Sequence, residues 1–122
     1  MNFYILFALM LNNILPPIGR IYSTSINIPL IGNQNIKYQR TKKLISEITL
    51  TGKINNLGYI YFDKYDPYKY TIDTKLDNIL KKYKCTLSNP YYDDINDAII
   101  FNININLIKF SKKLTLINNE YL

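Results

Sequence analysis

Residues 99–110, with the sequence IIFNININLIKF, constrain the fold of this chain more than any other segment. Apolar and polar residues alternate strictly along it: Phe101, Ile103, Ile105 and Leu107 on one side, and Asn102, Asn104 and Asn106 on the other. Successive side chains of a β-strand point to opposite faces of a sheet, so this pattern predicts a strand with one buried and one solvated face. Such a strand is typical of an antiparallel sheet that packs on one side only.

Several other segments give weaker versions of the same pattern. We expect strands over residues 20–31, 45–51 and 59–62, with Pro29 at an edge or a strand end. The last two would form a hairpin through the glycine- and asparagine-containing residues 52–58. Residues 68–72 and the alternating tail 112–118 are further candidate strands, and residues 32–35 predict a turn.

One segment has clear helical spacing. Leu76, Ile79, Leu80 and Tyr83 recur at intervals of three and four, and Asp73 precedes them as a candidate N-cap, so we expect a helix over residues 73–83. Residues 37–47 fit either a short helix or an exposed basic loop. The fold class expected is α+β: a small single domain over residues 1–122, mostly antiparallel strands with one or two short helices.

The N-terminal segment, residues 1–17, is a separate feature. Residues 3–11 are nine consecutive apolar residues, too few to cross a bilayer, where about 20 are needed, and Pro16 and Pro17 follow. We expect no transmembrane span and predict that this segment packs on the core or on a partner. The alternative is a signal peptide cleaved near Ser23 or Thr24, although no basic residue precedes the apolar run.

The residue types that the chain lacks limit its chemistry. It contains no histidine and one cysteine, Cys85. Histidine is the usual general base and the commonest metal ligand, so histidine-based triads and cysteine-histidine zinc sites are excluded. The aspartates around residues 63–73 and 93–97 do not have the spacing of a calcium-binding loop. We therefore expect a protein that is not an enzyme, with no catalytic residues, no metal and no cofactor.

The charge points to a polyanionic partner. Lysine and arginine number 15 against nine aspartate and glutamate residues, which gives a net charge of +6 and a pI near 9.3. Lysine and arginine neutralise phosphates, and an exposed tyrosine can stack on a base. The residues predicted to bind nucleic acid are Lys37, Tyr38, Arg40, Lys42, Lys43, Lys81, Lys82, Lys84, Lys112 and Lys113.

The composition adds a resemblance. The chain holds 21 Ile, 16 Asn, 13 Lys and 12 Tyr, four residues whose codons are rich in A and T. In this it resembles the ribosomal proteins encoded in AT-rich mitochondrial or plastid genomes. The resemblance covers the whole chain and involves no family motif. It implies a structural subunit of a mitochondrial or plastid ribosome, a ribonucleoprotein, in contact with rRNA and neighbouring proteins, in a hetero-assembly and with no small-molecule substrate.

Two other functions remain open on the sequence. One is an accessory subunit of an organellar respiratory membrane complex, with residues 3–11 buried against partners. The other is a secreted or viral β-rich binding domain with a signal peptide.

Overall fold

The computed structural model describes residues 15–66, 69–88 and 90–121, and in these ranges nine strands form one antiparallel sheet. The strands are β1 (Ile21–Ile28), β2 (Gly32–Lys42), β3 (Ile45–Gly52), β4 (Asn56–Phe62), β5 (Tyr70–Ile72), β6 (Cys85–Leu87), β7 (Tyr91–Asp93), β8 (Ala98–Ile105) and β9 (Phe110–Asn118). The helices are α2 (Thr74–Lys82) and the short 3-10 segments η1 (Asn106–Ile108) and η2 (Asn119–Tyr121). The expected small, mostly antiparallel domain is confirmed, and it is largely β.

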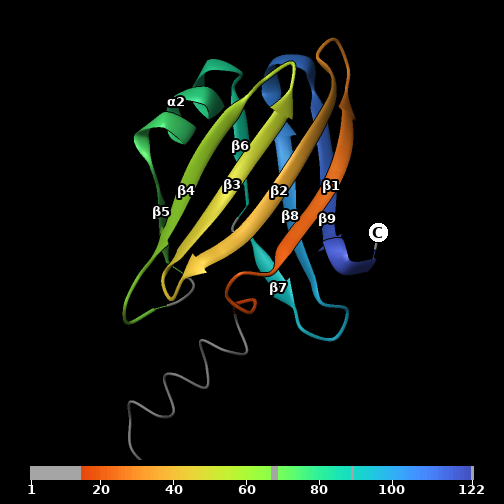
Figure 1. The fold of residues 1–122 in the computed structure, drawn as a ribbon. Coiled ribbons are helices and arrows are strands. Elements are labelled where there is room, and N and C mark those ends of the chain that lie inside the picture. Colours follow the sequence, from red (N-terminus) through yellow and green to blue (C-terminus); the bar gives the residue numbers. More distant parts are fainter. Residues whose placement is uncertain (1–14, 67–68, 89, 122) are drawn as a thin grey trace, which may run out of the picture.

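The sheet consists of two groups of strands. Its order is β5-β4-β3-β2-β1-β9-β8-β6, and β7 also pairs with β8. Strands β1 to β5 form a meander in which each strand pairs with the next. Strands β6, β7 and β9 all pair with β8. The two groups meet where β9, near the end of the chain, lies beside β1 (Figure 1).

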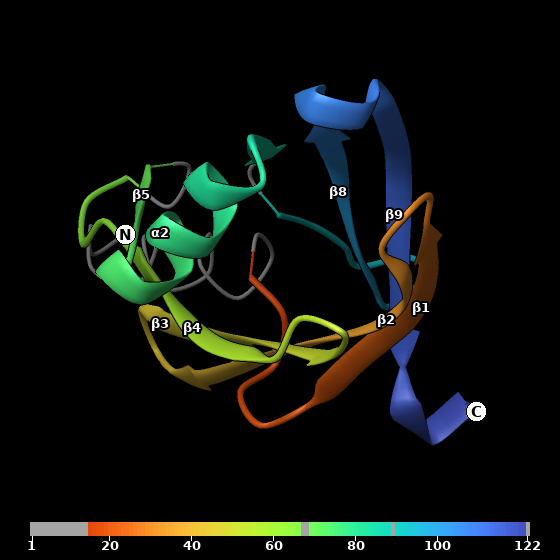
Figure 2. The same ribbon diagram turned by 90° about the horizontal axis from the view of Figure 1, so that it is seen from above.

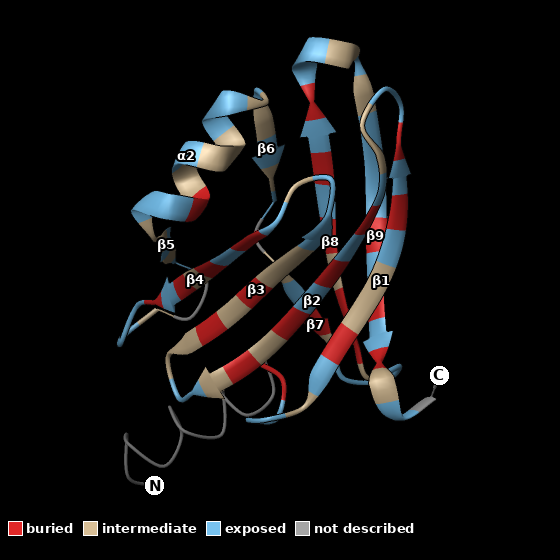
Figure 3. Cartoon of the chain, turned by 45° about the horizontal axis from the view of Figure 1, so that its top comes forward, coloured by how far each residue is buried: buried red, intermediate tan, exposed pale blue. Residues whose placement is uncertain are grey.

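The sheet is strongly curled around a single apolar interior. Seen from above, it forms an open U, with α2 on the open side (Figure 2), and α2 contacts both β4 and β6. Buried and exposed positions alternate along the strands, so one face of each strand supplies the core (Figure 3). The core includes Tyr22, Ile26, Ile36, Tyr38, Ile48, Ile60, Phe101, Ile103, Leu114 and Leu116.

Helix α2 confirms the sequence prediction, with one change in the role of Asp73. This residue occupies the N-cap position, but its side chain makes no capping hydrogen bond. Its carboxylate instead accepts a 2.8 Å hydrogen bond from the backbone N–H of Tyr59 in β4. Asp73 therefore fastens the start of the helix to the sheet.

A glycine permits the close contact between α2 and β4. A Cβ atom added to Gly58 would lie 2.5 Å from the Cβ of Leu76, the most deeply buried residue of the helix at 1% exposure. Because a Cβ is fixed to the backbone, rotation of the leucine side chain cannot relieve this contact. The absence of a side chain at residue 58 thus sets the distance between helix and sheet.

Three expectations about local structure were wrong. Residues 32–35 belong to β2, and residues 37–42 continue this strand instead of forming a helix or loop. The apolar alternation is hidden there because Gln34 and Arg40 occupy two of its inward positions. The strand expected over 99–110 ends at Ile105, and η1 then turns the chain into β9, with Lys109 in the left-handed region at φ 52°.

The N-terminal segment is described only from residue 15, so residues 1–14 lie outside the described part of the chain. Leu15 is 3% exposed and belongs to the core, and the carbonyl of Pro16 accepts a hydrogen bond from Arg40. The described end of the segment thus packs on the core. Among the described residues, no helix has the length and apolar character that crossing a bilayer requires.

We predict that Gly58→Ala destabilises the protein. The added methyl group forces α2 away from β4, and overpacking of this kind costs about 1–3 kcal/mol. The change is measurable as a lower urea midpoint in equilibrium unfolding. Thr49→Ala serves as the control on the same sheet. Thr49 lies on β3, opposite Leu57 of β4. An equal midpoint for Gly58→Ala and the wild type would show that the helix moves away without cost.

Candidate functional site

The antiparallel register places the connections between strands at two opposite ends of the domain. Ile28 of β1 lies opposite Gly32, and Ile105 of β8 lies opposite both Phe110 and Cys85. Because all pairings are antiparallel, four connections share one end, the upper end in Figure 1. They are the β1–β2, β3–β4, α2–β6 and β8–β9 connections.

This upper end is rich in lysine, and we call it the basic end. All its lysines are exposed. Among the described residues, the acidic side chain that contacts these lysines is that of Asp77 in α2, which forms a 2.8 Å ion pair with Lys81. The lysines of the basic end are Lys53, Lys81, Lys82, Lys84, Lys109, Lys112 and Lys113.

The acidic residues gather at the opposite end. They lie in the β4–β5 loop, in the turn between β7 and β8, and after β9: Asp63, Asp66, Asp93, Asp94, Asp97 and Glu120. Basic residues lie there as well, so this end carries charges of both signs: Arg20, Lys42, Lys43, Lys64 and Lys69. The structure therefore separates the lysines predicted to bind nucleic acid into two groups. Lys37 lies between them, exposed in the middle of β2 and beside a polar hollow lined by Ser23, Ser25 and Thr115.

Two of the residues predicted to bind nucleic acid are buried, and this part of the prediction is wrong for the folded chain. Tyr38 is 1% exposed, and burial raises its pKa to about 12. Arg40 is 3% exposed, and its guanidinium donates to the carbonyls of Lys43, at 2.7 and 3.0 Å, and Pro16, at 3.0 Å. Both occupy inward positions of β2, so Tyr38 offers no ring face for a base to stack on.

A cavity of about 60 Å³ lies between α2 and the curled sheet. We call it the inner cavity. Its walls are almost entirely aliphatic and aromatic, and they include Ile36, Ile48, Leu76, Phe101 and Ile103. This apolar character excludes polar chemistry inside it. The one free thiol of the chain, Cys85, also lines it, and burial raises the pKa of that thiol to about 11, which makes it a poor nucleophile near neutral pH.

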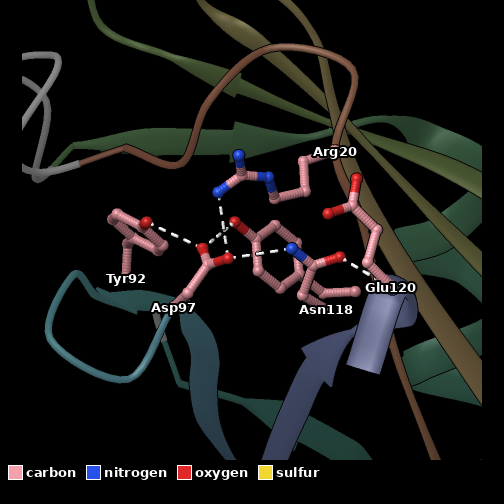
Figure 4. Close-up of polar contacts among 6 residues, drawn as sticks. Arg20, Tyr92, Asp97, Asn118 and Glu120 are labelled. Atoms are coloured by element: carbon pink, nitrogen blue, oxygen red, sulfur yellow. Dashed lines mark hydrogen bonds and ion pairs between the residues drawn. The ribbon is translucent and has the colours of Figure 1, made fainter. Parts of the chain in front are cut away.

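The densest polar cluster of the described residues is centred on Asp97 (Figure 4). Its carboxylate accepts hydrogen bonds from Tyr22 at 2.6 Å, from Tyr92 at 2.9 Å and from Asn118 at 2.9 Å. Arg20 adds a 2.9 Å ion pair. These donors come from β1, β7, β9 and the residue before β1, so one carboxylate joins both groups of strands.

Asp97 is held in its charged form. Desolvation is the largest single influence and raises its pKa, but the hydrogen bonds from Tyr22, Asn118 and Tyr92 and the charge of Arg20 together outweigh it, so the pKa lies below its usual value. Burial and the bond to Asp97 raise the pKa of Tyr22, which remains a donor. A carboxylate that already accepts four donors is suited to holding strands together rather than to accepting a proton from a substrate.

No sequence pattern distinguishes Asp97 from the other residues of its acidic stretch. Its role depends on a left-handed backbone, φ 51°, and on donors from 75 and 77 residues earlier in the chain. The inner cavity was missed for a similar reason, since its walls come from strands and a helix throughout the chain.

We predict that Asp97 makes the free energy of unfolding decrease as the solution becomes acidic. Its folded-state pKa lies below the unfolded value of about 3.9, so its stabilisation is complete above about pH 4 and is lost as the pH falls through the folded-state pKa. Asp97→Asn should lower the free energy of unfolding by about 2 kcal/mol near neutral pH. It should also flatten the fall below about pH 4.

Urea unfolding at a series of pH values measures both effects. Asp94→Asn, which removes an exposed carboxylate from the same turn, is the matched control and should leave the slope nearly unchanged. Equal pH slopes for Asp97→Asn and the wild type would contradict the assignment.

Comparison with known proteins gives no family to which the chain can be assigned. No protein-family model matches it, and neither the curated proteins nor the solved structures include a significant match.

Proposed function

We propose that the protein is a structural component of an organellar ribosome, with a mitochondrial ribosome as the first candidate. Its basic end contacts RNA phosphates in this ribonucleoprotein. The observation that carries this proposal is the concentration of seven exposed lysines around the four connections at one end of the sheet. The compositional resemblance to organelle-encoded ribosomal proteins supports the setting.

The charge distribution supports this mode of binding. Lysines neutralise phosphates and release counterions, and this contribution does not depend on base sequence. Six of the nine acidic residues lie at the far end of the domain, where they offset its basic residues, so the basic end would turn toward RNA and the far end away from it, toward neighbouring proteins. Binding of this kind needs no catalytic group, metal or cofactor.

The proposal narrows the predicted RNA-contacting set. Lys81, Lys82, Lys84, Lys112 and Lys113 remain in it, and Lys53 and Lys109 join them because they share the same end. Lys37, Lys42 and Lys43 become secondary contacts, because the register places them away from that end.

We predict that Lys82, Lys112 and Lys113, changed together to Gln, weaken binding to single-stranded RNA. The slope of log affinity against log salt should fall by about 2, since each phosphate contact to a single strand contributes about 0.7. Fluorescence anisotropy with a labelled RNA between about 50 and 200 mM salt measures this slope. The matched control changes Lys42, Lys43 and Lys64 to Gln, which removes the same charge from the opposite end.

Equal losses in the two triple variants would show that net charge alone attracts RNA, and the basic end would then have no special role. Co-sedimentation of the protein with ribosomal particles tests the cellular setting. Extraction with a respiratory membrane complex instead would count against the ribosomal assignment.

A further inference from the structure

We propose that the inner cavity binds one straight-chain amphiphile, with its alkyl chain under α2 and its anionic head group among the lysines of the basic end. This is a small-molecule binding site in addition to the surface proposed to contact RNA. The shared chemistry of the ligand is an unbranched hydrocarbon chain with a carboxylate or phosphate at one end. A free fatty acid and a membrane lipid both supply that chemistry.

The walls of the cavity select a hydrocarbon. Its volume of about 60 Å³ exceeds the roughly 10–15 Å³ that one water molecule needs, but it is smaller than the roughly 150 Å³ of an apolar cavity that binds benzene, so the cavity takes the end of an alkyl chain rather than a long chain. The amide of Gln34, a buried polar group on the wall, is already engaged, because it accepts from the N–H of Ile54 and donates to the carbonyl of the same residue, both at 2.9 Å. Water gains little in such a space, whereas an alkyl chain gains burial.

Part of the cavity wall lies at the basic end. Three of its lining residues, Ile31, Ile54 and Tyr83, belong to three of the connections there, and all three are half-buried. Lysines adjoin two of them in the sequence: Lys53 precedes Ile54, and Lys82 and Lys84 flank Tyr83. A chain that enters between these connections would therefore leave its head group close to positive charge.

Two exposed leucines at the same end also fit an amphiphile. Leu30, in the β1–β2 connection, is 88% exposed and has a φ of 69°, which bulky side chains rarely adopt. Leu107, in η1, is 63% exposed. Folding gains nothing from either side chain in these positions, whereas both could cover the part of an alkyl chain that emerges from the cavity, or enter the surface of a bilayer.

The first experiment uses propanoate, butanoate, hexanoate and octanoate, a series that spans the chain length at which a cavity of about 60 Å³ is filled, to displace the fluorescent sulfonate 1-anilinonaphthalene-8-sulfonate from the full chain. Affinity should rise about fourfold per added CH₂ until the cavity is full. Octanoate should bind more tightly than uncharged 1-octanol. Displacement that is independent of chain length, or equal affinity for octanoate and octanol, would overturn the proposal.

Cys85 provides a second, site-specific measurement on the unaltered protein. It is the one cysteine of the chain and it lines the cavity. A saturating alkanoate should slow its alkylation by N-ethylmaleimide several-fold. Protection by vesicles of phosphatidylglycerol, without protection by alkanoates, would identify a membrane lipid as the source of the ligand. Unchanged alkylation with both would overturn the proposal.

Two kinds of variant test where the alkyl chain and the head group of the ligand bind. Ile79→Trp should fill the cavity and abolish alkanoate binding, whereas Ile95→Trp, at a position 89% exposed at the opposite end, should not. Changing Lys53 and Lys84 together to Gln should weaken octanoate several-fold and leave octanol unaffected, and changing Lys42 and Lys43 to Gln is the control. If Ile79→Trp does not fold, the Cys85 measurement still decides. None of these assays contains RNA, so their outcome is separate from that of the proposed function.

Discussion

The narrow seam between β1 and β9 is the interaction on which the rest of the fold depends. Two residue pairs join these strands, Tyr22 with Asn118 and Ser23 with Ile117, whereas β1 and β2 pair along eight positions. So short a ladder would hold the two groups of strands weakly by itself. The Asp97 carboxylate strengthens it, because it binds Tyr22 of β1, Tyr92 of β7 and Asn118 of β9 at one point. The curl of the sheet, and hence the inner cavity, follows from this closure.

The arrangement of charge is a consequence of the same topology. Strands of an antiparallel sheet deliver alternate connections to opposite ends, so residues far apart in the sequence share an end while close neighbours are separated. Lys43 and Lys53 are ten residues apart but lie at opposite ends of β3. The lysine-rich connections thus lie at one end of the sheet, and the acidic β4–β5 and β7–β8 connections lie at the other. The net positive charge of the chain is thus concentrated at one end, because the other end carries both acidic and basic side chains.

Helix α2 completes the interior because the curled sheet leaves one side open. Leu76 can approach β4 closely since Gly58 has no side chain, and Asp73 fixes the start of the helix to Tyr59. Further along the helix, Ile79 and Leu80 line the cavity instead of filling it. The space that remains is apolar, and three of its lining residues, Ile31, Ile54 and Tyr83, belong to connections at the basic end.

The periodicities could be read from the sequence alone, and they predicted the largely antiparallel architecture, the position of α2 and most strands. Alternation and helical spacing are local properties, so they can be read without knowing what each segment touches. Local pattern failed at Arg40 and Gln34, polar residues that face inward because backbone groups from other segments satisfy them. The local pattern also failed to predict the turn at η1, because apolar and polar residues continue to alternate where the strand ends. Three features became visible in the folded chain alone: which lysines share an end, the burial of Tyr38 and Arg40, and the bonds by which Asp97 joins the two groups of strands. These depend on contacts between distant residues, which closure of the sheet creates.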